Sequence, residues 1–207
     1  MSDHFFEIDP ETRSLSEILE RLWKELAVAA DHIEHPWSHV SLATQTMDGP
    51  RQRILRLREA ENRDRSLFFY TDVRSPKVEQ IEVSSEVSGL MYDPSHHVQL
   101  SLTASAEIHH DDEIAEDHWQ RTPLEGRRHY MGIRDPGARA AGPSTNLPDD
   151  FLTEELTEEE SLEGKENFAV IILNVESMEL LWLRKSGNLR AEFVRTSTGW
   201  ESSWIEP

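Results

Sequence analysis

Short segments with the composition of β-strands recur along most of the chain, separated by turn residues. They lie at 39–47, 52–59, 66–71, 87–92, 98–108, 167–174, 178–183 and 189–195. Asp48-Gly49-Pro50 follows the first of them and is a turn sequence that favours a hairpin. Because strands joined by short turns pair antiparallel, and no strand–helix–strand repetition is visible, we expect an antiparallel sheet or barrel with helices packed outside, an α+β fold.

Helical patterns interrupt this series at a few places. Ser14 and Glu17 have the spacing of a capping box, and apolar residues then recur at helical intervals, which predicts an amphipathic helix over 15–34 that ends before Pro36. Pro76, at a first helical position, predicts a short helix to about residue 84.

The region from 111 to 166 is less regular. We expect helix over 111–133 with a break near Pro123, a long loop over 134–150, and an acidic surface helix or partly disordered insertion over 149–166. No linker divides the chain into self-sufficient halves, so we expect one domain over 1–207.

The charge balance excludes several classes of partner. Forty acidic residues face twenty-one basic ones, for a net charge of −19, which disfavours nucleic acids and anionic membrane surfaces. No apolar run reaches the length of a membrane-spanning helix, and the N-terminal residues lack the pattern of a signal peptide, so we expect a soluble cytoplasmic protein. The chain has no cysteine, and its paired histidines are read as turn and cap residues, so we assign no metal.

Against this acidic background, cations gather in one stretch. They are Arg51, Arg53, Arg56 and Arg58 on one predicted strand, and Arg74 and Lys77 at the start of the following helix. Guanidinium groups and helix N-termini are favourable places for a phosphate. Because the cations are local, we expect a small anionic ligand. The alternative is that these arginines pair with the many surface carboxylates.

Four short motifs follow one another through this stretch and beyond it. They are Arg53-Ile54-Leu55-Arg56-Leu57-Arg58, Phe69-Tyr70-Thr71, Ser75-Pro76-Lys77 and the single residue Gln99. Their order and spacing resemble those of the pyridoxamine 5'-phosphate oxidase superfamily, over about residues 36–108 and 167–207. The resemblance implies a split β-barrel that binds FMN at the interface of a homodimer and acts on a small-molecule substrate.

The resemblance also implies which residues contact the cofactor. The predicted FMN-binding residues are Arg53, Ile54, Leu55, Arg56, Leu57, Arg58, Tyr70, Thr71, Ser75, Lys77, Gln99, Trp182 and Arg190. The cationic and hydroxyl groups suit the phosphate of FMN, and the tyrosine and amide suit the ring and its polar edge. No catalytic side chain is assigned, because the flavin carries the reactivity.

The chain departs from the family pattern at several positions. Pro76 stands where the family has an arginine, for which Arg74 is a possible replacement, and Arg58 stands where it has a lysine. The segment 185–190 lacks the histidine of the oxidases' substrate-binding stretch, so we expect a relative of the oxidases and not a vitamin-biosynthesis enzyme. Simple strand alternation also puts Arg53 and Arg58 on opposite faces unless a bulge or strong twist intervenes.

The sequence therefore leaves three functional hypotheses. The first is an FMN-dependent oxidoreductase acting on an unidentified small molecule. The second is a non-catalytic carrier or sensor of flavin or heme on the same fold, and the third is a deazaflavin-dependent reductase. Trp119, Arg121 and Tyr130 lie where the family places residues around its substrate, or they simply pack a helix against the barrel.

Overall fold

The computed structural model describes residues 9–152 and 156–207, and its centre is a closed barrel. The barrel strands are β1 (His39–Thr44), β2 (Arg51–Glu61), β3 (Ser66–Asp72), β4 (Glu86–Asp93), β5 (Val98–His109) and β6 (Phe168–Trp182). All neighbouring pairs are antiparallel in the order β3-β2-β1-β4-β5-β6, and β6 pairs back onto β3. The expected α+β split barrel is confirmed.

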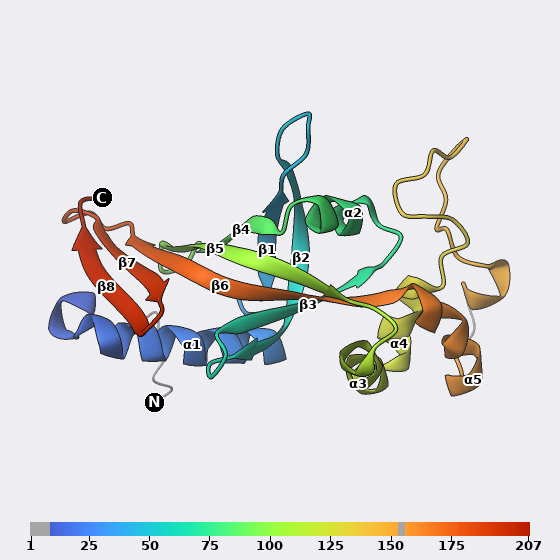
Figure 1. Cartoon of the computed structure of the whole chain (residues 1–207), viewed down its shortest axis with the longest axis horizontal. Coiled ribbons are helices and arrows are strands. Elements are labelled where there is room, and N and C mark those ends of the chain that lie inside the picture. Colours follow the sequence, from blue (N-terminus) through green and yellow to red (C-terminus); the bar gives the residue numbers. More distant parts are fainter. Residues whose placement is uncertain (1–8, 153–155) are drawn as a thin grey trace.

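Two further strands extend the sheet beyond the barrel. Strand β7 (Leu189–Thr196) pairs with the second half of β6, and β8 (Gly199–Ile205) pairs with β7. Figure 1 shows this hairpin at one end of an elongated molecule, with β5 and β6 running most of its length. The two ends of β6 therefore lie in different surroundings.

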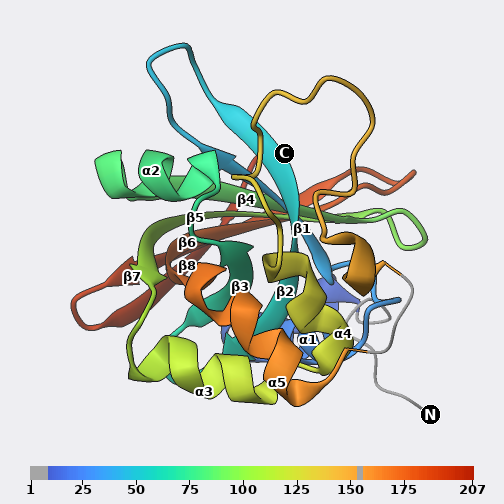
Figure 2. The same ribbon diagram turned by 90° about the vertical axis from the view of Figure 1, so that its right-hand side faces the viewer.

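Helices cover the barrel from three sides. Helix α1 (Leu15–Asp31) buries its apolar face beside β2, and the short helix η2 (Pro10–Thr12) precedes it. Helix α2 (Pro76–Val83) lies near the barrel end where β3 stops (Figure 1). The helices α3 (Glu113–Arg121), α4 (Leu124–Arg127), η3 (Arg128–Tyr130), η4 (Asp149–Phe151), α5 (Glu158–Ser161) and η5 (Leu162–Asn167) gather at the end opposite the β7–β8 hairpin (Figures 1 and 2).

Alternation along the strands creates two apolar clusters. Inward residues such as Leu57, Phe69 and Leu100 are fully buried in the barrel together with the apolar face of α1. The outer faces of β3 and β6 carry the second cluster, which α3 and η3 cover: Phe68, Trp119, Tyr130, Phe168, Val170 and Ile172. Strand β3 is thus buried on both faces, and its successive side chains belong to different environments.

The structure corrects the predicted strand limits at several points. The segments 167–174 and 178–183 form the single strand β6, because no turn residue separates them and one extra residue, Glu176, is accommodated as a bulge opposite β5. Strand β1 ends at Thr44 instead of residue 47, since Thr46 begins a turn that Gly49 closes. The C-terminal strand β8 is longer than the Gly199-Trp200 pair suggested.

The helical predictions hold with shorter limits. The capping box of Ser14 and Glu17 is present, but α1 ends at Asp31 because His32–Ser38 forms successive turns that lead into β1. The break near Pro123 is confirmed between α3 and α4. The acidic segment forms the short helices α5 and η5, while residues 153–155 lie outside the described ranges. No helix in the described ranges has both the length and the apolar character that crossing a bilayer requires.

Candidate functional site

Arg53 lies at the end of the barrel that α2 covers. Its position on β2 faces inward beside Leu42, so its guanidinium enters the barrel end instead of the outer surface. Nη1 donates to Leu42 O at 3.3 Å and to Thr44 Oγ1 at 2.8 Å, and Nη2 donates to Gln80 Oε1 at 2.8 Å. Desolvation lowers the pKa of Arg53. The guanidinium remains charged and is held between β1 and α2.

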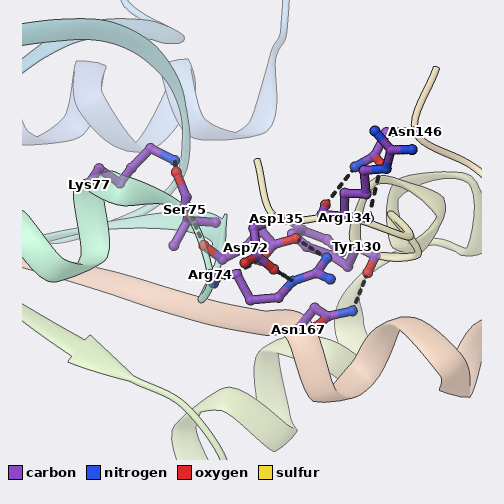
Figure 3. Close-up of polar contacts among 10 residues, drawn as sticks. Asp72, Arg74, Ser75, Lys77, Tyr130, Arg134, Asp135, Asn146 and Asn167 are labelled. Atoms are coloured by element: carbon purple, nitrogen blue, oxygen red, sulfur yellow. Dashed lines mark hydrogen bonds and ion pairs between the residues drawn. The ribbon is translucent and has the colours of Figure 1, made fainter. Parts of the chain in front are cut away.

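Lys77 approaches the same place from the first turn of α2. Its ammonium donates to Ser75 Oγ at 2.6 Å (Figure 3). It also donates to Thr71 Oγ1 at 2.9 Å. Burial, followed by the charge of Arg53, lowers the pKa of Lys77 to about 8, against a weaker opposing effect of Asp72. Two cations that raise each other's free energy in this way favour an anion between them.

The start of α2 adds a third favourable element. Ser75 is the N-cap residue, yet its side chain makes no capping hydrogen bond and instead accepts from Lys77. Pro76 occupies the first helical position and has no N–H group. The N-terminal end of this eight-residue helix therefore has no side-chain cap, and uncapped helix N-termini favour phosphate binding.

Arg74 belongs to a different group of charges. Its Nε and Nη2 donate to the two carboxylate oxygens of Asp72 at 3.0 and 2.7 Å, and Asp135 of the long loop lies 3.8 Å from Nε (Figure 3). This pairing raises the pKa of Arg74. The hypothesis that Arg74 replaces the missing family arginine is therefore not favoured, because Asp72 occupies its donor edge.

The bulge considered from the sequence is present at Arg58. The register between β2 and β3 shifts between Leu57 and Glu59, so Arg58 is the extra residue. Its guanidinium lies over the ring of Tyr70, 5.0 Å from the centroid, on the outer face of the barrel. Arg53 and Arg58 thus lie on opposite faces of β2, Arg53 bonded to Thr44 and Gln80 at the barrel end and Arg58 over Tyr70 on the outer face. The bulge does not bring them together.

The remaining residues of the first motif have mostly structural positions. Leu57 is fully buried in the barrel, and Leu55 packs against the same core. Ile54 is 67% exposed on the outer face, and Arg56 lies on that face opposite His39 of β1. Of Ile54, Leu55, Arg56 and Leu57, Ile54 is the one that is exposed.

Three predicted cofactor residues lie far from α2. Gln99 and Arg190 flank Leu181 on neighbouring strands, and Arg190 donates to Glu179 Oε2 at 2.7 Å. Trp182 is 7% exposed and packs near Trp204.

The distance between the two groups follows from the register of β6. Thr71 pairs with Ala169, whereas Gln99 pairs with Leu181, twelve positions further along the same strand. At roughly 3.3 Å per residue this separation is about 40 Å. Within one chain, the predicted residues form two groups at opposite ends of β6.

Two contacts of the site were missed by the sequence analysis. Gln80 holds Arg53, and its position three residues after Lys77 places both on one helix face, which was a readable signal. His118 shares a 3.0 Å hydrogen bond with the Tyr70 hydroxyl, but nothing in the sequence links α3 to β3.

One cavity of the described structure lies away from these residues. It has a volume of about 870 Å³ and lies between α3 and η5, with acidic residues around much of its rim. None of the predicted cofactor residues lines it. The candidate site lies instead at the barrel end, at the start of α2 beside Thr71 of β3.

Comparisons with known proteins support the family resemblance and the fold. Residues 20–110 match the sequence profile described as pyridoxamine 5'-phosphate oxidase, FMN-binding domain. This range contains Arg53, Tyr70, Lys77 and Gln99, so the resemblance seen in the motifs is confirmed. No curated protein matches the chain by sequence.

Two solved structures share the fold over nearly the whole chain. A pyridoxamine 5'-phosphate oxidase-related, FMN-binding protein from Nostoc punctiforme has a TM-score of 0.70 and 22% identity, covering 97% of this chain and 100% of that one. PhzG from Burkholderia lata, in complex with tetrahydrophenazine-1-carboxylic acid, has a TM-score of 0.68 and 19% identity, covering 97% and 98%. At these identities the likeness establishes the fold.

Proposed function

We propose that this pyridoxamine 5'-phosphate oxidase-like split-barrel protein binds FMN, with the phosphate at the start of α2. The observation that carries the proposal is the convergence of Arg53 and Lys77 in a chain of net charge −19. Thr71 and Ser75 accept two hydrogens of the Lys77 ammonium and leave the third for a phosphate oxygen. The donors present therefore fit a phosphate monoester.

The flavin ring is expected to extend from this phosphate along the outer face of the barrel. Tyr70 and Arg58 line that direction, since Tyr70 immediately precedes Thr71 and faces outward. A flat aromatic ring with polar edges suits a tyrosine face and a guanidinium donor. FMN, once bound, would supply the electron exchange, and the protein would orient it.

A titration tests cofactor binding directly. Purified protein mixed with FMN is expected to quench flavin fluorescence at micromolar concentration, because the phosphate adds charge-assisted hydrogen bonds to ring contacts. Arg53→Ala and Lys77→Ala are each expected to weaken FMN binding at least about tenfold. Arg51→Ala, an exposed arginine two positions earlier, is the matched control. Absence of binding by the wild type would reject the proposal.

We further propose that two copies of the chain complete the site as a homodimer. Thr71, which accepts from Lys77, pairs with Ala169 of β6, and Arg190 pairs with Leu181, about 40 Å further along the strand, so we infer that Lys77 and Arg190 do not contact the same FMN within one chain. If both contact it, the second group must come from a partner copy. Light scattering is expected to give twice the mass of 23.9 kDa.

Mixed dimers provide a sharper test of the shared site. Arg53→Ala/Lys77→Ala disables one end of the chain and Arg190→Ala disables the other. Each variant alone is expected to bind FMN weakly, whereas co-expression is expected to restore one tight site per mixed dimer. If mixing restores nothing while the wild type binds FMN, the site lies within one chain and Arg190 has no part in it.

For the activity, we propose an oxidoreductase whose substrate is a small anionic molecule. Arg58 supplies the support, because its guanidinium lies over the ring of Tyr70, beside the proposed position of the flavin ring. Photoreduction of the bound flavin, followed by reoxidation with oxygen and candidate acceptors, tests turnover. A bound flavin that never cycles would favour the non-catalytic carrier instead.

A further inference from the structure

The side-chain amide of Gln80 holds Arg53, one of the two cations of the candidate phosphate site. Its Oε1 accepts from the Thr44 hydroxyl at 2.6 Å and from Arg53 Nη2 at 2.8 Å. Gln80 follows Lys77 by three residues on α2, so both lie on one face of the helix. One short helix thus carries the ammonium group and the acceptor that holds the guanidinium.

These contacts use only one edge of the Arg53 guanidinium. Nη1 donates to Leu42 O and Thr44 Oγ1, and Thr44 Oγ1 itself lies 2.6 Å from Gln80 Oε1. The two side-chain acceptors therefore sit together on the Nη1–Nη2 side. Within residues 9–152 and 156–207, Arg53 Nε has no hydrogen-bond acceptor, and Nη2 keeps a second hydrogen. The Nε–Nη2 edge is the pair of parallel donors that an oxyanion accepts in bidentate form.

Arg74 provides the internal contrast. Asp72 accepts from Nε and Nη2 of Arg74, the same edge that Arg53 leaves open. Asp72 also brings a negative charge, which neutralises the arginine. Gln80 fixes Arg53 through a neutral oxygen whose two lone pairs are both used, so the full positive charge remains available to a ligand.

We propose that Gln80, supported by Thr44, is the positioning residue that turns Arg53 toward a phosphate and makes the protein select phosphorylated over unphosphorylated flavin. This inference rests on the FMN site proposed above and assigns its selectivity to residues that contact no ligand themselves. An orientation effect of this kind acts on the phosphate alone, because the flavin ring is expected to lie along Tyr70, on the outer face of β3 and away from Gln80.

Paired titrations with FMN and riboflavin test the assignment. Gln80→Leu and Thr44→Val are expected to weaken FMN binding about tenfold and about threefold, while riboflavin affinity stays within about twofold. Gln80→Glu is expected to weaken FMN binding further, since its carboxylate would pair with Arg53 as Asp72 pairs with Arg74. Gln120→Glu, an exposed glutamine on α3, makes the same charge change away from the site and is expected to leave both affinities unchanged.

Competition by inorganic phosphate gives a second readout that does not depend on the ring. Phosphate is expected to displace FMN from the wild type and to compete about tenfold less well in Gln80→Leu. Equal losses for FMN and riboflavin, with a lowered melting temperature, would show that Gln80 only holds the fold and would overturn the inference. Should the wild type bind neither flavin, the proposed function itself fails, so the two failures are distinguishable. Thr44→Val, which keeps the volume of the side chain, provides a test if Gln80→Leu does not fold.

Discussion

The hydroxyl of Tyr70 and Nδ1 of His118 lie 3.0 Å apart and share a hydrogen bond that joins the barrel to α3. His118 is 3% exposed, and its ring stacks on Phe68 with 5.3 Å between centroids. Burial is the main cause that lowers the pKa of His118, and the charge of Arg121 adds to it, whereas Glu59 and Asp117 oppose it and His109 lowers it slightly. The lowered pKa favours the neutral imidazole, whose Nδ1 can accept a hydrogen bond from the Tyr70 hydroxyl.

The first prediction concerns stability in mild acid. Because the pKa of His118 is lower in the folded than in the unfolded chain, its contribution to folding is present above about pH 6.5 and is lost as the pH falls through the folded-state value. His118→Phe keeps the stacking on Phe68 and removes the titration. Urea unfolding at pH 7.5 and 5.5 is expected to show a smaller loss of stability for this variant than for the wild type. An equal loss of stability in the wild type and in His118→Phe would show that His118 does not cause this pH dependence.

The second prediction concerns the pH dependence of FMN binding. The pKa of Lys77 is about 8 without ligand, and a phosphate stabilises the protonated amine. The dissociation constant for FMN is therefore expected to rise above pH 8, by up to about tenfold at pH 9, whereas that for riboflavin is expected to stay flat. Lys77→Met is expected to bind FMN weakly at every pH.

The free energy of unfolding of the unliganded chain is expected to rise with pH in the range where FMN binding weakens. Since the unfolded Lys77 keeps its proton to about pH 10.5, whereas the folded one loses it near pH 8, this lysine makes the free energy of unfolding rise between those values. The comparison of wild type with Lys77→Met isolates this contribution. An FMN affinity that is constant from pH 7 to 9 would exclude Lys77 as a phosphate ligand.

The sequence predicted the barrel because alternation and turn residues act locally. The prediction of strand limits was wrong where the sequence has no local signal. No residue type at 175–177 marks the bulge that joins two predicted segments into β6, because a bulge needs no glycine or proline. The site could likewise be predicted only where its residues are close together in the sequence. Lys77 and Ser75 are neighbours in sequence, but the acceptors of Arg53 come from β1 and α2, and only the closed barrel brings these elements together.

A third prediction concerns the acidic segment, which one buried cation anchors. Arg127 is 6% exposed and donates to Glu158, to Ser161 and to the Thr122 carbonyl oxygen, beneath the ring of Trp119. Arg127→Met would leave buried acceptors unpaired, so we expect a loss of about 3 kcal/mol in the free energy of unfolding. Limited proteolysis is expected to cut near α5 sooner than in the wild type.

An exposed arginine provides the control for this change. Arg121 pairs with Glu59 and Asp117 on the surface of the same region, where ion pairs contribute about 0–1 kcal/mol. Arg121→Met is therefore expected to leave the unfolding free energy nearly unchanged. If both variants lose the same stability, the network around Arg127 does not anchor the acidic segment.

The last prediction concerns Pro76, which stands where the family that this chain resembles has an arginine. Asp72 holds the Nε–Nη2 edge of Arg74, so among the described residues Arg53 and Lys77 are the cations that converge beside the start of α2. Pro76→Arg adds a guanidinium at the first helical position and is expected to tighten FMN binding about tenfold at low salt, with riboflavin unaffected. Loss of the preorganised proline is expected to lower the unfolding free energy by up to about 1 kcal/mol, which Pro76→Ala would reproduce without the gain in affinity. Because the new contact is electrostatic, the gain should shrink as the salt concentration rises. An unchanged FMN affinity in Pro76→Arg would mean that the phosphate does not lie at the start of α2.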